Sequence, residues 1–358
     1  MIGLRGNERA GTPFGTYGAP CARRAPVRTT GARADCREAE GCGQGALPGG
    51  EWQDAPPGAR GTGSDPGEAP LSALDSGRRS DEARHAARAL FRRARWQSWL
   101  GRRERALALC REAVERADYS RAYVLMTRLA LPGEDYLHVL GRIHRHLEPR
   151  TYLEIGVARG DSLVQVLPST AAIGIDPQPN LRKPPHAGHR IFATTSDEFF
   201  ASHDVRAELG GRALEMAFID GLHRFEQALC DFINVERACA RDAVILVHDC
   251  YPLDARTAQR EQVTKFWSGD IWRLVLLLRE RRPDLTVHTI AAPPTGLGIV
   301  LNPDPDSRLL ADHREELTGE YLAKDYAVLE GRRREALGLV ANHWPAIRAL
   351  LERFRGVV

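Results

Sequence analysis

Residues 152–162 read YLEIGVARGDS, an apolar run that leads into a glycine-containing turn. Short, uninterrupted apolar runs are typical of strands that are buried on both faces. Gly156 and Gly160 follow the run, and glycine is favoured where a backbone needs positive φ or passes close to a ligand. We predict a strand over 152–157, a turn, and a short apolar helix over 162–167.

The same pattern of short apolar runs followed by turns or helices continues after residue 167. Further apolar runs lie at 172–175, 190–193, 214–219 and 243–247, and a helix is expected over 224–240. Strands that alternate with helices form a mainly parallel sheet with helices on both faces. After a helix over 272–282, runs at 285–290 and 296–301 are separated by Pro293-Pro294, a connection short enough for an antiparallel hairpin at the sheet edge. The sequence predicts an α/β fold with a seven-stranded, mainly parallel sheet.

Composition divides the chain into four parts. Residues 1–80 hold 16 of the 33 glycines and 8 of the 22 prolines, which predicts a disordered tail because too little apolar area is available for burial. Residues 81–147 are helical in pattern, with a start at Ser80, and Leu107, Cys110 and Val114 mark an apolar stripe. Residues 148–302 form the α/β domain. Residues 303–358 are a helical extension in which Pro345 is expected to split the helical pattern of 336–354.

Charge and cysteine content exclude several classes of protein. The chain has 50 basic and 47 acidic residues among 358, a net charge of +3, so no electrostatic footprint for nucleic acid or an anionic membrane is present. No run of 18 apolar residues predicts a transmembrane helix, and no apolar stretch near the start predicts a secretory signal. The seven cysteines are scattered without a C-x-x-C pair, so we expect a cytoplasmic protein without disulfides.

One acidic side chain lies within the first predicted strand and another directly follows the second. Glu154 stands two residues before Gly156, and Asp176 ends the second strand, where an acid typically binds a ribose diol. The glycine spacing is G-x-x-x-G, whereas dinucleotide sites show G-x-G-x-x-G to accommodate pyrophosphate. The pattern therefore indicates a nucleoside that carries a positive group and no phosphate. S-adenosylmethionine fits this description.

At this point the chain resembles the class I S-adenosylmethionine-dependent methyltransferases. The resemblance covers residues 148–302 and rests on the ordered motifs LEIGVARGDS (153–162), GIDP (174–177), TTSDEF (194–199), FIDGLHRFEQALCDF (218–232) and LVHDC (246–250). It implies a Rossmann-like fold. It also implies that Glu154, Gly156 and Gly160 form the cofactor loop, that Asp176 binds the ribose, and that Ser196 and Asp197 meet the adenine.

The ends of the fourth and fifth strands resemble those of metal-dependent O-methyltransferases, both the catechol type and those acting on sugar hydroxyls of macrolide antibiotics. Asp220 and His223 match an acid and a base three residues on, and Asp249 matches one acid of a pair. The resemblance implies His223 as general base, with Asp220 as a catalytic carboxylate, and Asp220, His248 and Asp249 as ligands of Mg²⁺ or Mn²⁺. The sequence departs from the pattern because His248 replaces an acid, or Cys250 an amide, depending on the register.

The resulting hypothesis is an O-methyltransferase that acts on a hydroxyl of a small polar acceptor, such as a sugar or glycosylated metabolite. Trp267 and Trp272 are either a sugar-stacking wall or part of the core. We expect no nucleic-acid or membrane partner, and a homo-oligomer could form through the N- or C-terminal helices. Two alternatives stay open: a nicotinamide-dependent oxidoreductase, disfavoured by the missing G-x-G, and an inert methyltransferase-fold scaffold whose helical region binds a partner.

Overall fold

The computed structural model describes residues 71–354, so the part of the predicted tail over 1–70 lies outside the described residues. The remaining part of that tail is helical. Helix α1 (Leu71–Trp99) begins nine residues before Ser80, so the predicted helix start at Ser80 was wrong. No proline interrupts residues 71–131, and the helical pattern extends back to Leu71, directly after Pro70.

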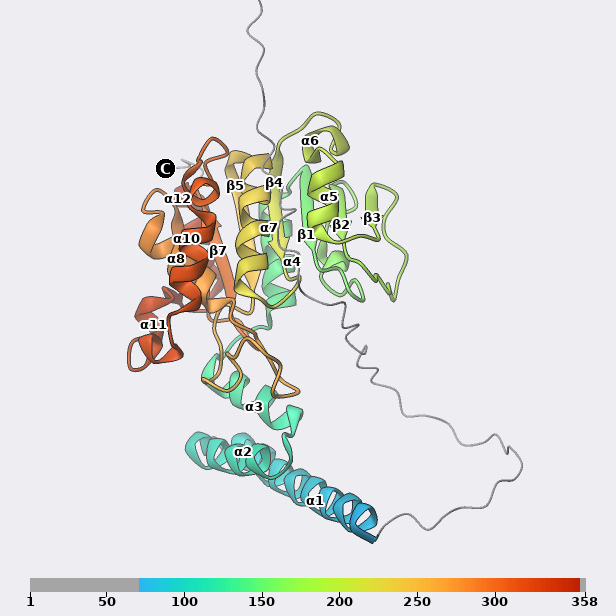
Figure 1. Ribbon diagram of the computed structural model, residues 1–358, viewed down its shortest axis with the longest axis vertical. Coiled ribbons are helices and arrows are strands. Elements are labelled where there is room, and N and C mark those ends of the chain that lie inside the picture. The colour runs from blue at the N-terminus through green and yellow to red at the C-terminus, as the bar shows by residue number, and fades with distance from the viewer. Residues whose placement is uncertain (1–70, 355–358) are drawn as a thin grey trace, which may run out of the picture. The chain divides into compact units, whose positions relative to one another are not determined.

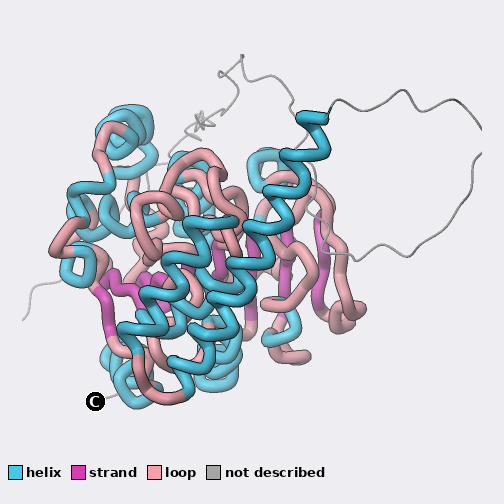
Figure 2. The backbone as a smooth tube through the Cα atoms, turned by 90° about the horizontal axis from the view of Figure 1, so that it is seen from below, coloured by secondary structure: helices cyan, strands magenta, loops and turns pink. Residues whose placement is uncertain are grey.

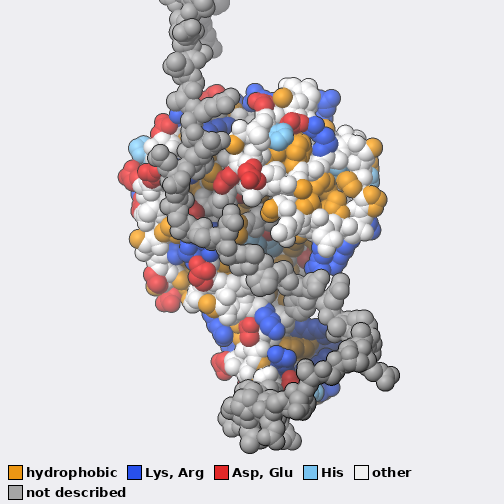
Figure 3. All heavy atoms as spheres, turned by 45° about the vertical axis from the view of Figure 1, so that its right-hand side comes forward, with side chains coloured by type: hydrophobic (Ala, Val, Ile, Leu, Met, Phe, Trp, Pro, Cys, Tyr) orange, Lys and Arg blue, Asp and Glu red, His pale blue; other side chains and the backbone are white. Residues whose placement is uncertain are grey.

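Three more helices precede the sheet: α2 (Arg103–Ala117), α3 (Ser120–Ala130) and α4 (Tyr136–Leu147). The predicted stripe of Leu107, Cys110 and Val114 is buried in a core that α1, α2 and α3 share. Helix α4 belongs to a different core, because its Leu140 and Ile143 pack against the sheet. Figure 3 shows arginine side chains at the surface of the α1–α3 region, in the lower part of the view.

The α/β prediction is confirmed by an eight-stranded sheet in the order β3-β2-β1-β4-β5-β7-β6-β8 (Figure 1). Its strands are β1 (Thr151–Ile155), β2 (Ala171–Ile175), β3 (His189–Phe192), β4 (Leu214–Ile219), β5 (Cys239–His248), β6 (Thr286–Ile290), β7 (Leu297–Leu301) and β8 (Leu339–Val340). Strands β1 to β5 pair in parallel, and β6 and β7 form the predicted antiparallel hairpin. Figure 2 shows the strands as one row. The eighth strand, which pairs with β6, was not predicted because it is only two residues long.

The connections of the first half of the sheet are short. The predicted helix over 162–167 is only a 3₁₀ turn, η1 (Leu163–Gln165), and it is followed later by α5 (Ser196–Ser202) and α6 (Val205–Glu208). Helix α7 (Phe225–Ala238) connects β4 to β5, and α8 (Trp272–Arg281) precedes β6, both close to their predicted ranges. The long crossovers therefore follow β4 and β5.

The C-terminal extension differs from the prediction. It contains α9 (Leu309–Asp312), α10 (Arg314–Leu322), η2 (Tyr326–Leu329), α11 (Arg333–Ala336) and α12 (Trp344–Phe354). The predicted helix over 336–354 was wrong in its first half, where β8 lies instead. Pro345 does not split a helix: it lies in the first turn of α12, where a missing N–H leaves no hydrogen bond unmade.

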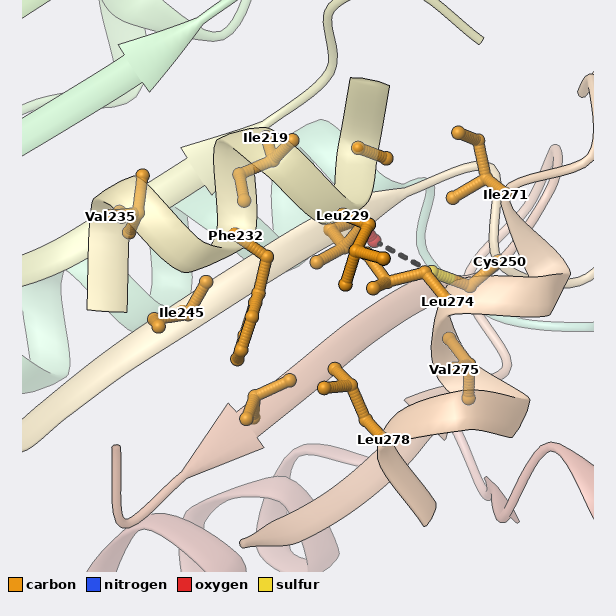
Figure 4. Close-up of a cluster of buried hydrophobic side chains, with 14 of the residues drawn as sticks. Ile219, Leu229, Phe232, Val235, Ile245, Cys250, Ile271, Leu274, Val275 and Leu278 are labelled. Carbon is orange, nitrogen blue, oxygen red and sulfur yellow. Dashed lines mark hydrogen bonds between the residues drawn. The ribbon is translucent and has the colours of Figure 1, made fainter. Parts of the chain in front are cut away.

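Apolar side chains fill both faces of the sheet. On one face, Ile219 of β4 and Ile245 of β5 pack against α7 and α8 through Phe232 and Leu278 (Figure 4). On the other face, the sheet packs against α4 and against Ile347 and Leu351 of α12. Among the described residues, no helix combines the length and the apolar character needed to span a membrane.

Candidate active site

A cavity of about 760 Å³ opens at the carboxyl ends of β1, β2, β4 and β5. Ligands of open α/β sheets bind at this edge because the helix-forming connections leave a crevice there. The predicted site residues that line the cavity are Gly156, Asp176, Ser196, Asp197, Asp220, His223, His248 and Asp249. Eight predicted site residues that span 94 positions of the sequence thus line one cavity.

The loop after β1 is shaped by Gly156 and Asp176. Gly156 has a φ of 88°, and a Cβ at this position would lie 1.9 Å from the backbone oxygen of Asp220, so only glycine fits. The carboxylate of Asp176 accepts hydrogen bonds from the backbone N–H groups of Ala158 and Gln178, each at 2.7 Å. Asp176 therefore connects the ends of β1 and β2 while it faces the cavity.

Ser196 and Asp197 lie at the start of α5 and line the cavity. The Gln227 side chain joins them to α7: its Nε2 lies 3.3 Å from Ser196 Oγ and 3.0 Å from Asp197 Oδ1. The same nitrogen donates to Asp231 at 3.2 Å. Asp231 is buried, and burial raises its pKa to about 6. Gln227 lines the cavity and was missed from the sequence, because a glutamine on a helix carries no distinctive signal.

Two predicted cofactor residues do not line the cavity. Glu154 is fully buried, and it accepts hydrogen bonds from Ser162 Oγ at 2.6 Å and from the Tyr152 hydroxyl at 2.8 Å. Burial raises the pKa of Glu154 to about 8, so its carboxyl group is mostly protonated at pH 7. Gly160 has a φ of 75° and faces Leu181. Both residues shape the loop from behind.

Two acids and two histidines form a cluster at the ends of β4 and β5. His248 Nδ1 lies 3.1 Å from Asp220 Oδ1 and 3.2 Å from Asp249 Oδ2. His223 Nε2 lies 3.2 Å from Asp249 Oδ2 and 3.8 Å from Asp220 Oδ1. Asp249 has a φ of 59°, in the left-handed region that aspartate enters more readily than most residues.

The buried His248 forms ion pairs with Asp249 and Asp220 in this cluster. Burial alone would lower the pKa of His248, but the carboxylates of Asp249 and Asp220 outweigh burial and raise it well above its usual value. Burial alone would raise the pKa of Asp249, but the neighbouring His248 and His223 lower it to about 2. His248 is therefore an imidazolium, further held by Thr295 Oγ1 at 3.3 Å from Nε2 and by the Tyr136 ring at 4.0 Å.

The geometry changes the predicted metal set. Ligand atoms of Asp220, His223 and Asp249 lie within 4.8 Å of one another and could hold a cation. His248 is not a member of this group: its Nδ1 lies 3.1 Å from Asp220 Oδ1 and 3.2 Å from Asp249 Oδ2, within hydrogen-bond distance of both carboxylates. The sequence could not show which of the two histidines lies beside the carboxylates in this way.

Gly269 and Asp270, in the connection between β5 and α8, hold the segment that carries His223 in place. Gly269 has a φ of 62°, and a Cβ there would lie 1.9 Å from the backbone oxygen of His223. Asp270 is fully buried, and its Oδ1 accepts the N–H of Phe225, the first residue of α7, at 2.8 Å. The segment around His223 is thus held by a connection that starts after the neighbouring strand. Neither residue carried a sequence signal, since both contacts are long-range.

The tryptophans separate into two roles. Trp272 is 1% exposed and belongs to the core. Trp267 lines the cavity, with its ring 5.2 Å from that of His223, and its Nε1 donates to the Gln259 backbone oxygen at 2.6 Å. Leu222, Phe266 and Pro294 also line the cavity, and together with Trp267 they are called its apolar wall below. Cys250 is buried, and its thiol donates to the Val247 backbone oxygen (Figure 4), as expected for a packed thiol.

The cavity is acidic. Four aspartates line it, Asp176, Asp197, Asp220 and Asp249, and none of the described residues that line it is a lysine or arginine. Such a wall favours a cationic ligand and disfavours phosphate-bearing ones.

Comparisons with known proteins agree with this picture. Residues 153–250 match the family model of a methyltransferase domain. The comparison with curated proteins gives no match.

Several solved structures resemble the chain. One is the O-methyltransferase TomG from Streptomyces achromogenes, involved in tomaymycin synthesis, in complex with S-adenosylmethionine: 15% identity over 51% of this chain and 88% of that chain, TM-score 0.38. Another is the S-adenosylhomocysteine-bound methyltransferase PaMTH1 from Podospora anserina, with 12% identity over 68% of this chain and 100% of that chain and a TM-score of 0.37. A third is an O-methyltransferase from Bacillus cereus in complex with S-adenosylhomocysteine, with 12% identity over 50% of this chain and 87% of that chain and a TM-score of 0.34. Likenesses this distant bear on neither the substrate nor the site residues.

The family match falls on β1 to β5 and on the motifs that build the acidic cavity. Its residues include the glycine-containing loop after β1, the acid after β2 and the acid–histidine cluster. Residues 153–250, which build most of the acidic cavity, therefore match a methyltransferase domain.

Proposed function

We propose that the protein transfers the methyl group of S-adenosylmethionine to a hydroxyl of a small acceptor, with His223 as general base. The observation that carries the proposal is the position of His223. It lines the cavity together with Asp176 and Asp220, its Nε2 lies 3.2 Å from Asp249 Oδ2, and its ring lies 5.2 Å from that of Trp267.

The cofactor side is proposed to consist of Gly156, Asp176, Ser196 and Asp197. Asp176 accepts the two ribose hydroxyls with lone pairs that its backbone contacts leave free. Ser196 and Asp197, held by Gln227, meet the edge of the adenine. The four carboxylates stabilise a cofactor whose sulfonium and ammonium groups are both positive. Glu154 and Gly160 support the loop without contacting the cofactor.

The chemical step is a displacement at the methyl carbon. The acceptor oxygen forms a bond to the methyl carbon as the bond from sulfur to carbon breaks, and the electron pair stays on sulfur to give S-adenosylhomocysteine. The acceptor proton moves to Nε2 of a neutral His223, and Asp249 then pairs with the imidazolium. The protein's contribution is alignment of the oxygen behind the methyl group and removal of that proton.

A divalent cation is implied by the resemblance to metal-dependent O-methyltransferases. Two carboxylates and an imidazole are donors that Mg²⁺ or Mn²⁺ accepts, so Asp220, Asp249 and His223 fit such an ion in kind. An ion bound there would lower the pKa of the acceptor hydroxyl. However, the imidazolium of His248 already neutralises part of the carboxylate charge, and Nε2 of His223 cannot serve as both ligand and base. We therefore propose a reaction in which no metal ion is required.

The acceptor is proposed to be uncharged or cationic, with a flat face. The described lining has no lysine or arginine, and the His248 imidazolium is already paired with Asp220 and Asp249, so an acceptor carboxylate or phosphate would lack a free cationic partner. The ring of Trp267 beside His223 provides a surface on which the apolar face of a sugar can stack, one of the two roles that the sequence left open for this residue. An aromatic acceptor would fit the same wall.

The test is transfer of label from methyl-labelled S-adenosylmethionine to a panel that contains a neutral glycoside, catechol, dopamine and a coenzyme A thioester, with and without EDTA. We expect methylation of an uncharged or cationic member, none of the thioester, and no loss of activity with EDTA. Binding of the cofactor without methylation of any acceptor would contradict the proposal. Binding of NAD(H) instead would favour an oxidoreductase.

A further inference from the structure

The connection from Asp249 to Ile271, between β5 and α8, supplies Phe266 and Trp267 to the apolar wall of the cavity. This connection is contacted by the helical region that precedes the methyltransferase domain. The Phe266 ring stacks on the Tyr123 ring of α3, with centroids 5.5 Å apart and planes at 11°. Leu253 and Phe266 both pack against the buried cluster that α1, α2 and α3 form.

A hydrogen bond adds to the stacked pair. The backbone N–H of Lys265 donates to Asp118 Oδ2 at 2.9 Å, across 147 residues of sequence. Asp118 is the residue that ends α2: its φ of 45° lies in the left-handed region, and its own N–H bonds to the Val114 oxygen. The end of α2 therefore fixes the direction of this carboxylate.

Tyr123 is held rigidly. It is 1% exposed, and burial raises its pKa to about 12, so its ring is a neutral phenol at all physiological pH values. Since one neighbour of Phe266 in the chain is Trp267, whose ring lies 5.2 Å from that of His223, a shift of Phe266 is passed to the wall beside the base.

We propose that Asp118 and Tyr123 are positioning residues for the acceptor side of the active site, so that the helical region is a functional part of the enzyme. The inference rests on the proposed function, because it assigns the wall of Phe266 and Trp267 to the acceptor. The contacts of the proposed cofactor side are with other segments: Asp176 accepts from the N–H groups of Ala158 and Gln178, and Ser196 Oγ lies 3.3 Å from Gln227 Nε2. Changes at Asp118 or Tyr123 therefore affect acceptor binding and leave cofactor binding unchanged.

The test uses the full chain and three tyrosine variants. Tyr123→Leu removes the ring, and Tyr123→Phe keeps it. Tyr119→Leu is the matched control, because Tyr119 pairs with Phe91 inside the same helical region, at 5.4 Å, and has no described ring contact with the connection. Asp118→Gly removes the acceptor of the Lys265 N–H while it still permits the left-handed backbone, and it serves if Tyr123→Leu does not fold.

Three quantities are measured: hydrogen–deuterium exchange of residues 265–267, affinity for S-adenosylhomocysteine by calorimetry, and KM for the acceptor that the panel identifies. For Tyr123→Leu and Asp118→Gly we expect faster exchange and a KM about three- to tenfold higher, as expected for the loss of one aromatic pair or one hydrogen bond. Affinity for S-adenosylhomocysteine is expected to stay within twofold. Tyr119→Leu is expected to match the wild type, and Tyr123→Phe is expected to lie closer to the wild type than Tyr123→Leu does, because it keeps the ring.

Equal effects of Tyr119→Leu and Tyr123→Leu on exchange at 265–267 would overturn the inference, since they would show a general loosening of the helical region. Unchanged exchange in Tyr123→Leu and Asp118→Gly would also overturn it. Failure of the proposed function is distinguishable, because the wild type would then methylate no acceptor. The exchange measurement, which needs no acceptor, would still decide the positioning role.

Discussion

Substitution of Gly269 by alanine tests whether the position of His223 is catalytic. The added Cβ would lie 1.9 Å from the His223 backbone oxygen and 2.7 Å from the His223 Cβ. Both of these distances have to increase to at least 3.0 Å. The His223 segment therefore has to move by about 1 Å. Misplacement of a reacting group by about 1 Å can cost about a hundredfold in rate. We expect kcat of Gly269→Ala to fall by about that factor, while affinity for S-adenosylmethionine changes little.

Gly210→Ala is the matched control for this variant. Gly210 has a φ of 68°, close to the 62° of Gly269, but a Cβ there meets no atom within 4 Å. Both variants pay the same left-handed strain of about 1 kcal/mol, so only the contact with His223 differs. The assay is initial rate of methyl transfer at saturating cofactor, with thermal unfolding as a check on folding. Equal rates for the two variants would refute the reasoning.

Four further predictions follow from the site. Asp176→Asn weakens S-adenosylmethionine binding about tenfold in calorimetry, because the ribose hydroxyls lose a charged acceptor; unchanged affinity would place the ribose elsewhere. His223→Gln lowers kcat at least about a hundredfold, whereas the exposed His343→Gln does not. EDTA leaves initial rates unchanged, and a loss restored by Mg²⁺ would assign His223 to a metal ion. Glu154→Gln changes the pH dependence of stability. The pKa of Glu154 is raised from about 4.5 to about 8 in the folded chain, so wild-type stability falls between these pH values by up to about 1.4 kcal/mol per unit. The melting temperature of Glu154→Gln relative to wild type should therefore rise from pH 6 to pH 9, and a constant difference would argue against a protonated Glu154.

The strand pattern was readable because each predicted strand contains a short run of mostly apolar residues bounded by polar or turn-forming residues. Strand β4 was predicted at Leu214–Ile219, as observed, and β2 and β3 within one residue. Where local pattern carries little information, prediction failed. The run at 162–167 is apolar enough for a helix but forms only the turn Leu163–Gln165. Helix α1 begins at Leu71 although glycine and proline content suggested a disordered tail up to residue 80.

The site was predictable where parallel strands end, because their carboxyl ends must meet at one edge of the sheet. This rule brings Asp176, Asp220 and Asp249 together without knowledge of any side-chain contact. It could not show that Glu154, which lies within β1, is buried in the core and protonated. It also could not show the contacts of Gly269 and Tyr123, which join segments far apart in the sequence.

The most direct test of the central claim is a single-turnover measurement with methyl-labelled S-adenosylmethionine and a neutral hydroxyl acceptor from the panel, for wild type and His223→Gln at equal cofactor occupancy. We predict label on the acceptor oxygen with wild type, and a rate at least about a hundredfold lower with His223→Gln. Equal rates for the two proteins would remove His223 as the base. Full cofactor occupancy with no label on any hydroxyl would contradict the assignment of the cavity to O-methylation.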